Sequence, residues 1–202
     1  MHNANSSSDD QLHGHCRHIR DYGIFDENIF LIGFMGTGKT TVSEYLKTLL
    51  GMDVVEMDEA IARQEGLGIP DIFAIRGEDY FRNAETCLLK QMQNRKGFVV
   101  SCGGGVPMRD ENVREMKKSG RIILLTAAPE TIFERVRDSH DRPLLENNKT
   151  PEYIETLMEK RRPKYEAAAD LIIHTDHKSI PDICDEIIDG ILSMNSGSDL
   201  HR

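Results

Sequence analysis

The chain has 202 residues, a formal net charge of −9 at pH 7 and a hydrophobic content of 39%. This length suits one domain with a sizeable core, and the acidic balance argues against a general binder of nucleic acids or membrane surfaces. No apolar run approaches the ~20 residues of a membrane-spanning helix, and the start of the chain lacks the apolar core of a secretory signal. We therefore expect a cytoplasmic monomer with no nucleic-acid or membrane partner.

Residues 1–24 are rich in Asn, Ser, Asp and His and almost free of apolar side chains. Such a segment is typical of a flexible extension, an expression tag or a linker. A linker would leave open that the chain is part of a longer fused polypeptide. Some side chains here could hold a metal ion, but nothing suggests the packed second shell of a real zinc site, so we favour a segment without metal. These side chains are His13, His15, Cys16 and His18.

The stretch over residues 33–40, Gly-Phe-Met-Gly-Thr-Gly-Lys-Thr, fits the phosphate-binding pattern G-x-x-x-x-G-K-[ST]. An apolar run at 29–32 predicts a buried strand before it, and apolar residues at helical spacing from 41 to 50 predict a helix after it. In that context backbone N–H groups and a helix N-terminus bind phosphate. Lys39 would reach the β and γ phosphates and the Thr40 hydroxyl would bind Mg²⁺; a glycine-rich turn that matches by chance is the less favoured alternative. The expected nucleotide contacts are Gly36, Thr37, Gly38, Lys39, Thr40 and Thr41.

Two acidic residues mark the end of the next predicted strand, residues 52–57. Glu56 and Asp58 are two positions apart, so in an extended segment both side chains would lie on the same face. The carboxyl ends of strands in an open parallel sheet face the ligand crevice, which makes both residues candidates for the site. The alternative is that they are solvated acids, with Asp58 capping the helix that follows.

A third predicted strand, residues 97–101, runs into Gly103, Gly104 and Gly105. Consecutive glycines are costly to order. A ligand that approaches the backbone closely explains them better than a sharp turn, which is the alternative.

Helical periodicity covers most of the remaining chain. It extends over residues 71–95 with a break near Gly77, and Arg82 in this segment could be an ordinary i,i+4 partner of Glu78. Further helices are predicted at 59–65, 109–119, 129–137, 151–168 and 180–192, and further strands at 122–125 and 171–173.

Two segments in the last third of the chain contain arginines that are candidates for the site. Residues 139–149 are polar and contain Arg142 before a proline; they resemble a mobile lid more than a linker, because a helix with core residues resumes at once. In that helix Pro163 should produce a kink. Arg161 and Arg162 point about 100° apart, so only one of them should face a site.

Strands that alternate with helices, without hairpin turns, predict an α/β fold with a five-stranded parallel sheet in a three-layer α/β/α arrangement. We expect the folded domain to cover residues 25–194. Residues 195–202 are rich in Ser and Gly, and we expect them to form a disordered tail.

Several stretches together resemble the shikimate kinases, within the P-loop small-molecule kinases related to nucleoside monophosphate kinases. The resemblance covers about residues 28–192, and the order and spacing of the motifs make it more specific than the phosphate loop alone. Besides residues 33–40, the matching stretches are Met-Asp-Glu-Ala-Ile (57–61), Asp-Ile-Phe-Ala-Ile-Arg-Gly-Glu-Asp-Tyr-Phe-Arg (71–82), Ser-Cys-Gly-Gly-Gly (101–105), Arg-Pro-Leu-Leu (142–145) and Lys-Arg-Arg-Pro-Lys-Tyr (160–165).

The resemblance implies transfer of the γ-phosphoryl group of ATP, with Mg²⁺, to the 3-hydroxyl of shikimate. Lys39 resembles the phosphate-binding lysine of the family, Thr40 the Mg²⁺ ligand, and Asp58 the acid that holds the acceptor hydroxyls and can act as base. The resemblance also implies that Arg82 and Arg161 bind the shikimate carboxylate and that Gly103, Gly104 and Gly105 line the shikimate pocket. It implies that Arg142 closes over the phosphates and that Arg135 stacks on the adenine ring. Ser101 resembles a residue near the water shell of the metal.

One position departs from the family pattern, because the family usually has Asp where this chain has Glu56. Glu keeps the charge and is one methylene longer, so we expect it to act toward Mg²⁺ through water.

Two rival functions are another small-molecule kinase, such as one for gluconate or a nucleoside monophosphate, and a non-catalytic nucleotide-binding regulatory domain. A glycine triad with two separated arginines suits a small acid better than a nucleotide, and Lys39, Thr40, Asp58 and Arg142 together argue against a domain without catalysis.

Overall fold

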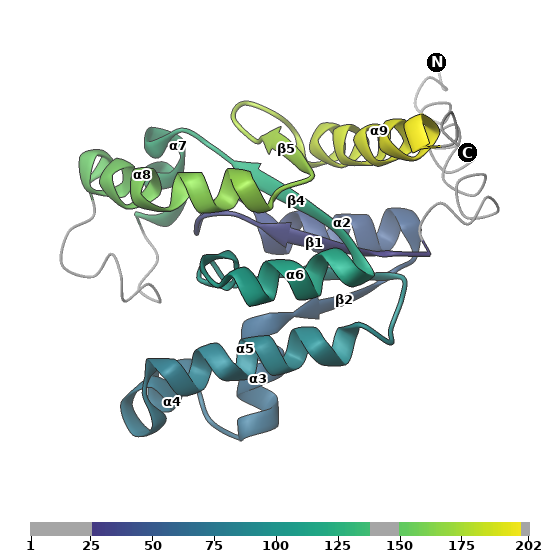
Figure 1. The fold of residues 1–202 in the computed structure, drawn as a ribbon. Coiled ribbons are helices and arrows are strands. Elements are labelled where there is room, and N and C mark those ends of the chain that lie inside the picture. The colour runs from purple at the N-terminus through teal and green to yellow at the C-terminus, as the bar shows by residue number, and fades with distance from the viewer. Residues whose placement is uncertain (1–25, 138–149, 199–202) are drawn as a thin grey trace, which may run out of the picture.

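Five strands form one sheet in which every neighbouring pair is parallel. The structure is a computed structural model that describes residues 26–137 and 150–198. Helices lie on both faces of the sheet (Figure 1), so the predicted three-layer α/β/α fold is confirmed. The order is β2-β3-β1-β4-β5, with β1 (Asn28–Ile32), β2 (Asp53–Glu56), β3 (Phe98–Ser101), β4 (Gly120–Thr126) and β5 (Leu171–His174).

One or more helices lie between successive strands, and most helix bounds lie within a few residues of the predicted ones. The predicted break near Gly77 separates two helices, since this residue has a φ angle of +83° that a side chain would strain. The helices are α2 (Lys39–Leu50), α3 (Met57–Glu65), α4 (Ile69–Arg76), α5 (Glu78–Met92), the short 3₁₀ helix η1 (Val106–Met108), α6 (Asp110–Ser119), α7 (Pro129–Val136), α8 (Pro151–Ala168) and α9 (Ile180–Ser198).

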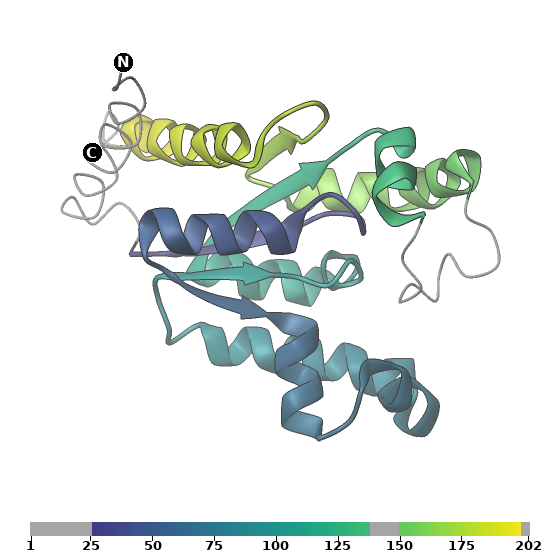
Figure 2. The same ribbon diagram turned by 180° about the vertical axis from the view of Figure 1, so that it is seen from behind.

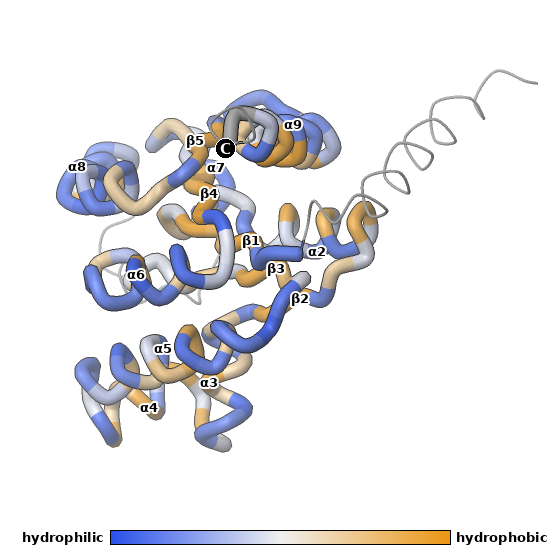
Figure 3. Tube along the Cα trace, turned by 45° about the vertical axis from the view of Figure 1, so that its right-hand side comes forward, coloured by the Kyte–Doolittle hydropathy of each residue, from blue (hydrophilic) through white to orange (hydrophobic). Residues whose placement is uncertain are grey.

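The central strand β1 is buried at every position, which explains its continuous apolar run. Phe30 and Ile32 pack into a core shared with α3, α5 and α6, whereas Ile29 and Leu31 pack into a second core shared with α2 and α9. Figure 2 shows the face covered by α2 and α9. In Figure 3 the apolar, orange parts of the trace gather on the strands and on the side of α9 that faces them.

A third, smaller core anchors the phosphate loop. Phe34, the second residue after β1, packs with Ile132 and Val136 of α7 and with Ile154 of α8. The loop is therefore held at the carboxyl end of the sheet by helices that come much later in the chain.

Two predictions are wrong in detail. The strand predicted at 52–57 ends at Glu56, and Asp58 lies in the first turn of α3, so the argument that two extended residues share a face does not apply. α9 continues to Ser198, so residues 195–198 are helical rather than part of a disordered tail. The small polar residues of this segment predict a tail, but the helix starts far earlier, on apolar residues that pack in the second core.

Other predictions fall outside the described residues. These are the N-terminal extension with its His and Cys cluster, the lid predicted at 139–149 with Arg142, and residues 199–202.

α8 runs through Pro163 without interruption. Of the helices that the structure describes, none combines the length and the apolar character needed to cross a membrane.

Candidate active site

The phosphate loop leaves β1 and ends at the start of α2. Its glycines have φ angles that other residues rarely adopt: +143° at Gly33, +77° at Gly36 and +95° at Gly38. A side chain at Gly33 would also collide with the backbone oxygen of Leu125 in β4. Because Gly38 provides no side-chain cap for α2, the first N–H groups of that helix stay available to an anion. The loop therefore fits the phosphates of a nucleotide.

Lys39 bends back over this loop. Its Nζ atom donates to the backbone oxygens of Gly33 and Phe34, each at 3.0 Å. Thr37 tightens the same turn, because its hydroxyl donates to the Phe34 oxygen at 2.8 Å. The ammonium group thus lies inside the curve of the loop, where the charge of a bound phosphate would meet it.

A polar corner joins α2 to the end of β2. The Ser43 hydroxyl lies 2.8 Å from the backbone oxygen of Thr40 and 3.1 Å from Glu56 Oε1, and Ser43 is fully buried. Glu56 is paired in the sheet register with Ser101. The structure thus brings together the Thr40, Glu56 and Ser101 positions that the sequence singled out, and it adds Ser43, which sequence reasoning missed.

The donor set of this corner fits Mg²⁺. In the described part of the chain, no three His, Cys, Asp or Glu side chains gather in a way that could hold a metal ion. Mg²⁺ is usually bound through one or two protein oxygens together with phosphate oxygens and waters. The hydroxyl of Thr40 and the carboxylate of Glu56 are oxygen donors of that kind.

The glycine triad, residues 103–105, lies under three side chains from three different helices. A Cβ atom at the first glycine would lie 2.8 Å from Asp58 Oδ1, and one at the second would lie 3.5 Å from Arg161 Nη1. At the third glycine a Cβ would overlap the guanidinium group of Arg82. Asp58, Arg82 and Arg161 therefore converge here as predicted, although the strand argument for Asp58 was wrong.

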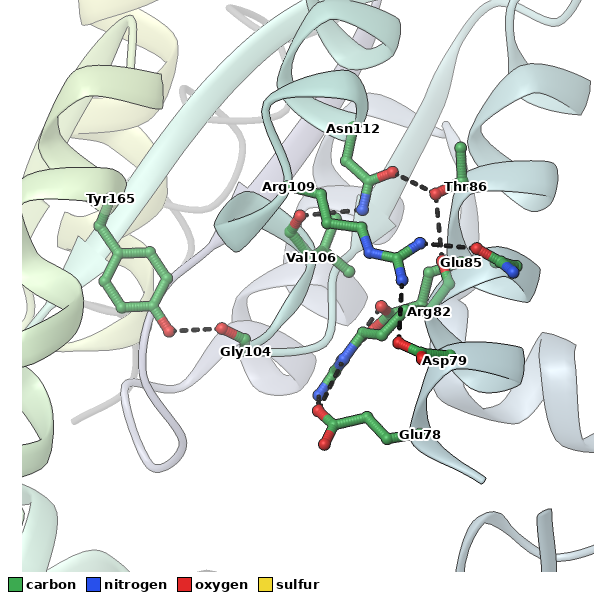
Figure 4. Close-up of polar contacts among 11 residues, drawn as sticks. Glu78, Asp79, Arg82, Glu85, Thr86, Gly104, Val106, Arg109, Asn112 and Tyr165 are labelled. Carbon is green, nitrogen blue, oxygen red and sulfur yellow. Dashed lines mark hydrogen bonds and ion pairs between the residues drawn. The ribbon is translucent and has the colours of Figure 1, made fainter. Parts of the chain in front are cut away.

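Arg82 is held by two carboxylates of its own helix (Figure 4). Its Nη1 atom donates to both oxygens of Glu85, at 2.9 and 3.0 Å. On the outer side, Nη2 contacts Glu78 Oε1 at 3.0 Å, so the i,i+4 pairing that the sequence suggested is also present. Arg82 can thus be an ordinary partner of Glu78 and still reach the glycine triad.

Glu85 was missed by sequence reasoning, although its position three residues after Arg82 on a helix is the available signal. Its side chain is fully buried. Burial raises the pKa of Glu85 from its ordinary value of 4.5 to about 7, while the charge of Arg82 acts in the opposite direction. Glu85 therefore orients Arg82 from a site in which the ionised carboxylate is costly.

α8 contributes Arg161 and Tyr165, one helical turn apart. The Tyr165 hydroxyl donates to the backbone oxygen of Gly104 at 2.7 Å, and burial raises the pKa of this phenol, so it stays a neutral donor. Arg161 lies 5.8 Å from the centre of the Phe34 ring, beside the phosphate loop. Arg162 instead pairs with Glu159 at 2.6 Å. This confirms that only one of the two arginines faces the site.

Arg135 of α7 contacts the opposite side of the phosphate loop. Its guanidinium group donates to the Gly36 oxygen at 3.2 Å and to the hydroxyl and backbone oxygens of Thr175 at 3.0 Å. These contacts place Arg135 at the edge of the loop. A role in stacking on adenine stays a prediction.

Comparison with known proteins points to one family. The profile described as shikimate kinase matches residues 35–192. The shikimate kinase of Persephonella marina is 44% identical over 80% of this chain and 96% of its own length. That of Thermodesulfovibrio yellowstonii is 40% identical over 85% of this chain and 98% of its own length.

Solved structures agree with these sequence matches. The structure of shikimate kinase from Acinetobacter baumannii in complex with shikimate has a TM-score of 0.79 at 34% identity, and the match covers 86% of this chain and 97% of that one. A gluconokinase from Sinorhizobium meliloti has a TM-score of 0.59 at 19% identity, over 87% of this chain and 97% of that one. The second likeness is one of fold alone.

Proposed function

Because the chain belongs to the shikimate kinase family, we propose that it is an enzyme that phosphorylates the 3-hydroxyl of shikimate with ATP. The products are shikimate 3-phosphate and ADP, in the biosynthesis of aromatic amino acids. The observation that carries this function is the convergence of Asp58, Arg82 and Arg161 on a glycine triad beside a phosphate loop.

On the nucleotide side, we propose that residues 36–41 bind the phosphates of ATP through their N–H groups and Lys39. The Thr40 hydroxyl would hold Mg²⁺, and Glu56 would hold a water of that ion. Bound Mg²⁺ supplies charge neutralisation of the phosphates. Arg142, in the segment for which the sequence predicts a lid, would neutralise the transferred phosphoryl group, and Arg135 would contact the adenine.

On the acceptor side, we propose that Arg82 and Arg161 bind the shikimate carboxylate, because guanidinium groups bind carboxylates in a bidentate way. The glycine triad, with no side chains, lets the ring approach the backbone. Asp58 would hold the acceptor hydroxyl and take its proton as it attacks the γ-phosphorus. Positioning of this kind supplies most of the catalysis in phosphoryl transfer.

The decisive experiment measures ADP release with a panel of acceptors. We expect ADP release that depends on shikimate, with little release in its absence or with gluconate or a nucleoside monophosphate. Release that depends on gluconate instead would favour the rival kinase, and ATP binding without ADP release for any acceptor would favour a regulatory domain.

We also propose that the protein is a monomer located in the cytoplasm. Light scattering coupled to size-exclusion chromatography would test the oligomeric state.

A further inference from the structure

A chain of buried hydrogen bonds links α5 to the end of the glycine triad. The Thr86 hydroxyl lies 2.7 Å from Asn112 Oδ1, and Asn112 Nδ2 donates to the backbone oxygen of Val106 at 2.9 Å. Asn112, on α6, is fully buried, and Thr86 is 6% exposed. In Figure 4 the amide group of Asn112 lies between these two partners. Each contact uses the correct end of the amide, because its oxygen accepts and its nitrogen donates.

Both ends of this hydrogen-bond chain lie beside the acceptor side of the site. Thr86 is one helical turn after Arg82, and its hydroxyl is also 3.0 Å from the Arg82 backbone oxygen. Asn112 Oδ1 and the Arg82 oxygen can both only accept, and the Thr86 hydroxyl has a single hydrogen. Two oxygens 2.7 Å apart would repel each other without a hydrogen between them, so we assign that hydrogen to the shorter contact, with Asn112. At the other end, Val106 directly follows the triad, and its N–H donates to the Gly103 oxygen at 3.0 Å.

The distance between α5 and the glycine triad, which these hydrogen bonds span, can change little. A Cβ atom at Gly105 would overlap the guanidinium group of Arg82, so the guanidinium lies directly over the backbone of the triad. Any shift of α5 relative to the triad therefore moves the charge of Arg82 relative to a ligand in the crevice. A misplacement of about 1 Å at a binding group can cost on the order of 100-fold in activity.

A second bridge between α5 and α6 lies at the surface. Arg109, just before α6, donates to Asn83 Oδ1 at 2.8 Å and lies 3.8 Å from the exposed Asp79 carboxylate. Solvent screens this pair, and exposed pairs contribute little. The buried contacts of Asn112 are therefore the stronger constraint on the distance between the helices.

We propose that Asn112, acting through Thr86 and Val106, is a positioning residue that sets the gap between Arg82 and the glycine triad. It does not touch a ligand. Its effect is on the affinity for an acceptor carboxylate and not on the affinity for ATP. This inference rests on the proposed function.

The test compares Thr86→Val, which keeps the shape and removes the hydroxyl, with Thr86→Ser, which keeps the hydroxyl. We expect Thr86→Val to raise the KM for shikimate about 5- to 10-fold, the range for losing one buried hydrogen bond. The KM for ATP should change less than about 2-fold. Thr86→Ser should keep the KM for shikimate near the wild-type value. Asn112→Leu should give a larger effect of the same kind, since it removes both contacts.

A destabilised control separates positioning from loss of stability. Ile187 is buried in the core between α2 and α9, away from the triad, and Ile187→Val or Ile187→Ala can be chosen to match the Tm of Thr86→Val. We expect the control to leave the KM for shikimate unchanged. The inference is overturned if the control raises this KM as much, or if Thr86→Val lowers Tm with an unchanged KM. A wild type without shikimate-dependent turnover would instead overturn the proposed function, and this inference with it.

Discussion

The phosphate loop and the acceptor side of the site meet at neighbouring strand ends, but they are built in different ways. Residues 33–40 are contiguous, and the side chains of Thr37 and Lys39 bond to oxygens of the loop itself. The acceptor side takes its residues from α3, α5, α8 and the loop after β3, which are far apart in the sequence.

This difference decides where substitutions act. The phosphate half depends on a few ligand-binding groups in a local backbone conformation, so loss of one group should act directly on turnover. The acceptor half also depends on buried side chains that need not touch a ligand, such as Glu85 behind Arg82 and Tyr165 behind the triad. We expect substitutions there to appear in the KM for shikimate and in stability. Four substitutions test the comparison.

Lys39→Met should have the largest effect. Removing the charge that meets the phosphates should lower kcat by ~10²–10³-fold, as loss of one preorganised donor does in other enzymes, with little change in stability. Steady-state kinetics checks this. Lys47→Met is the matched control, because Lys47 lies on the same helix and pairs with the exposed Glu44 at 3.6 Å. A kcat above a tenth of the wild-type value would remove Lys39 from the phosphate site.

Glu85→Gln should change how stability depends on pH. A raised carboxyl pKa means that the folded protein holds the proton more tightly than the unfolded chain does. The stability from that proton is fully present below pH 4.5 and is lost as pH rises through about 7. Relative to Glu85→Gln, the wild type should thus lose ~2.5 kcal/mol of unfolding free energy between pH 5 and pH 8.

Urea unfolding at several pH values measures this difference. Glu78→Gln, which removes the exposed partner of the same arginine, is the control for loss of an ion pair. Parallel curves for wild type and Glu85→Gln across this pH range would show that Glu85 titrates alike in the folded and unfolded states.

Arg82→Ala should raise the KM for shikimate about 10- to 100-fold and leave the KM for ATP nearly unchanged, since a charge-assisted hydrogen bond to the acceptor is lost. Arg162→Ala is the control, because Arg162 lies next to Arg161 in the sequence but pairs with the exposed Glu159. An increase confined to the KM for ATP would show that Arg82 does not bind the acceptor carboxylate.

Ser43→Ala should have the smallest effect. Losing the hydroxyl that contacts Glu56 should weaken divalent-metal binding about 5-fold, as measured by the binding of Mn²⁺ to the ADP complex in electron paramagnetic resonance. Thr48→Ala removes an exposed hydroxyl of the same helix that donates to the backbone oxygen of Glu44 at 3.2 Å, and this variant should bind Mn²⁺ as the wild type does. Equal Mn²⁺ affinities in the wild type and both variants would show that the Ser43–Glu56 contact plays no part in metal binding.

Much of the fold and site followed from local patterns. The buried strand and glycine pattern around residues 33–40 predicted the phosphate loop, and the break near Gly77 was also correct. Close approach of a ligand to the glycine triad stays a prediction. Asp58 was placed at the site for the wrong reason, because the switch from strand to helix at Glu56 leaves little trace in the sequence. The end of α9 was missed, because packing of its first turns stabilises a C-terminus with poor helix formers.

The sequence by itself determined the phosphate loop, because the φ angles of Gly33, Gly36 and Gly38 and the start of α2 depend on adjacent residues. Only the tertiary structure decided which side chains complete the acceptor side. Contacts such as Tyr165 with Gly104, or Asn112 with Thr86, depend on the angle and distance at which separate helices pack, and no local pattern encodes that geometry.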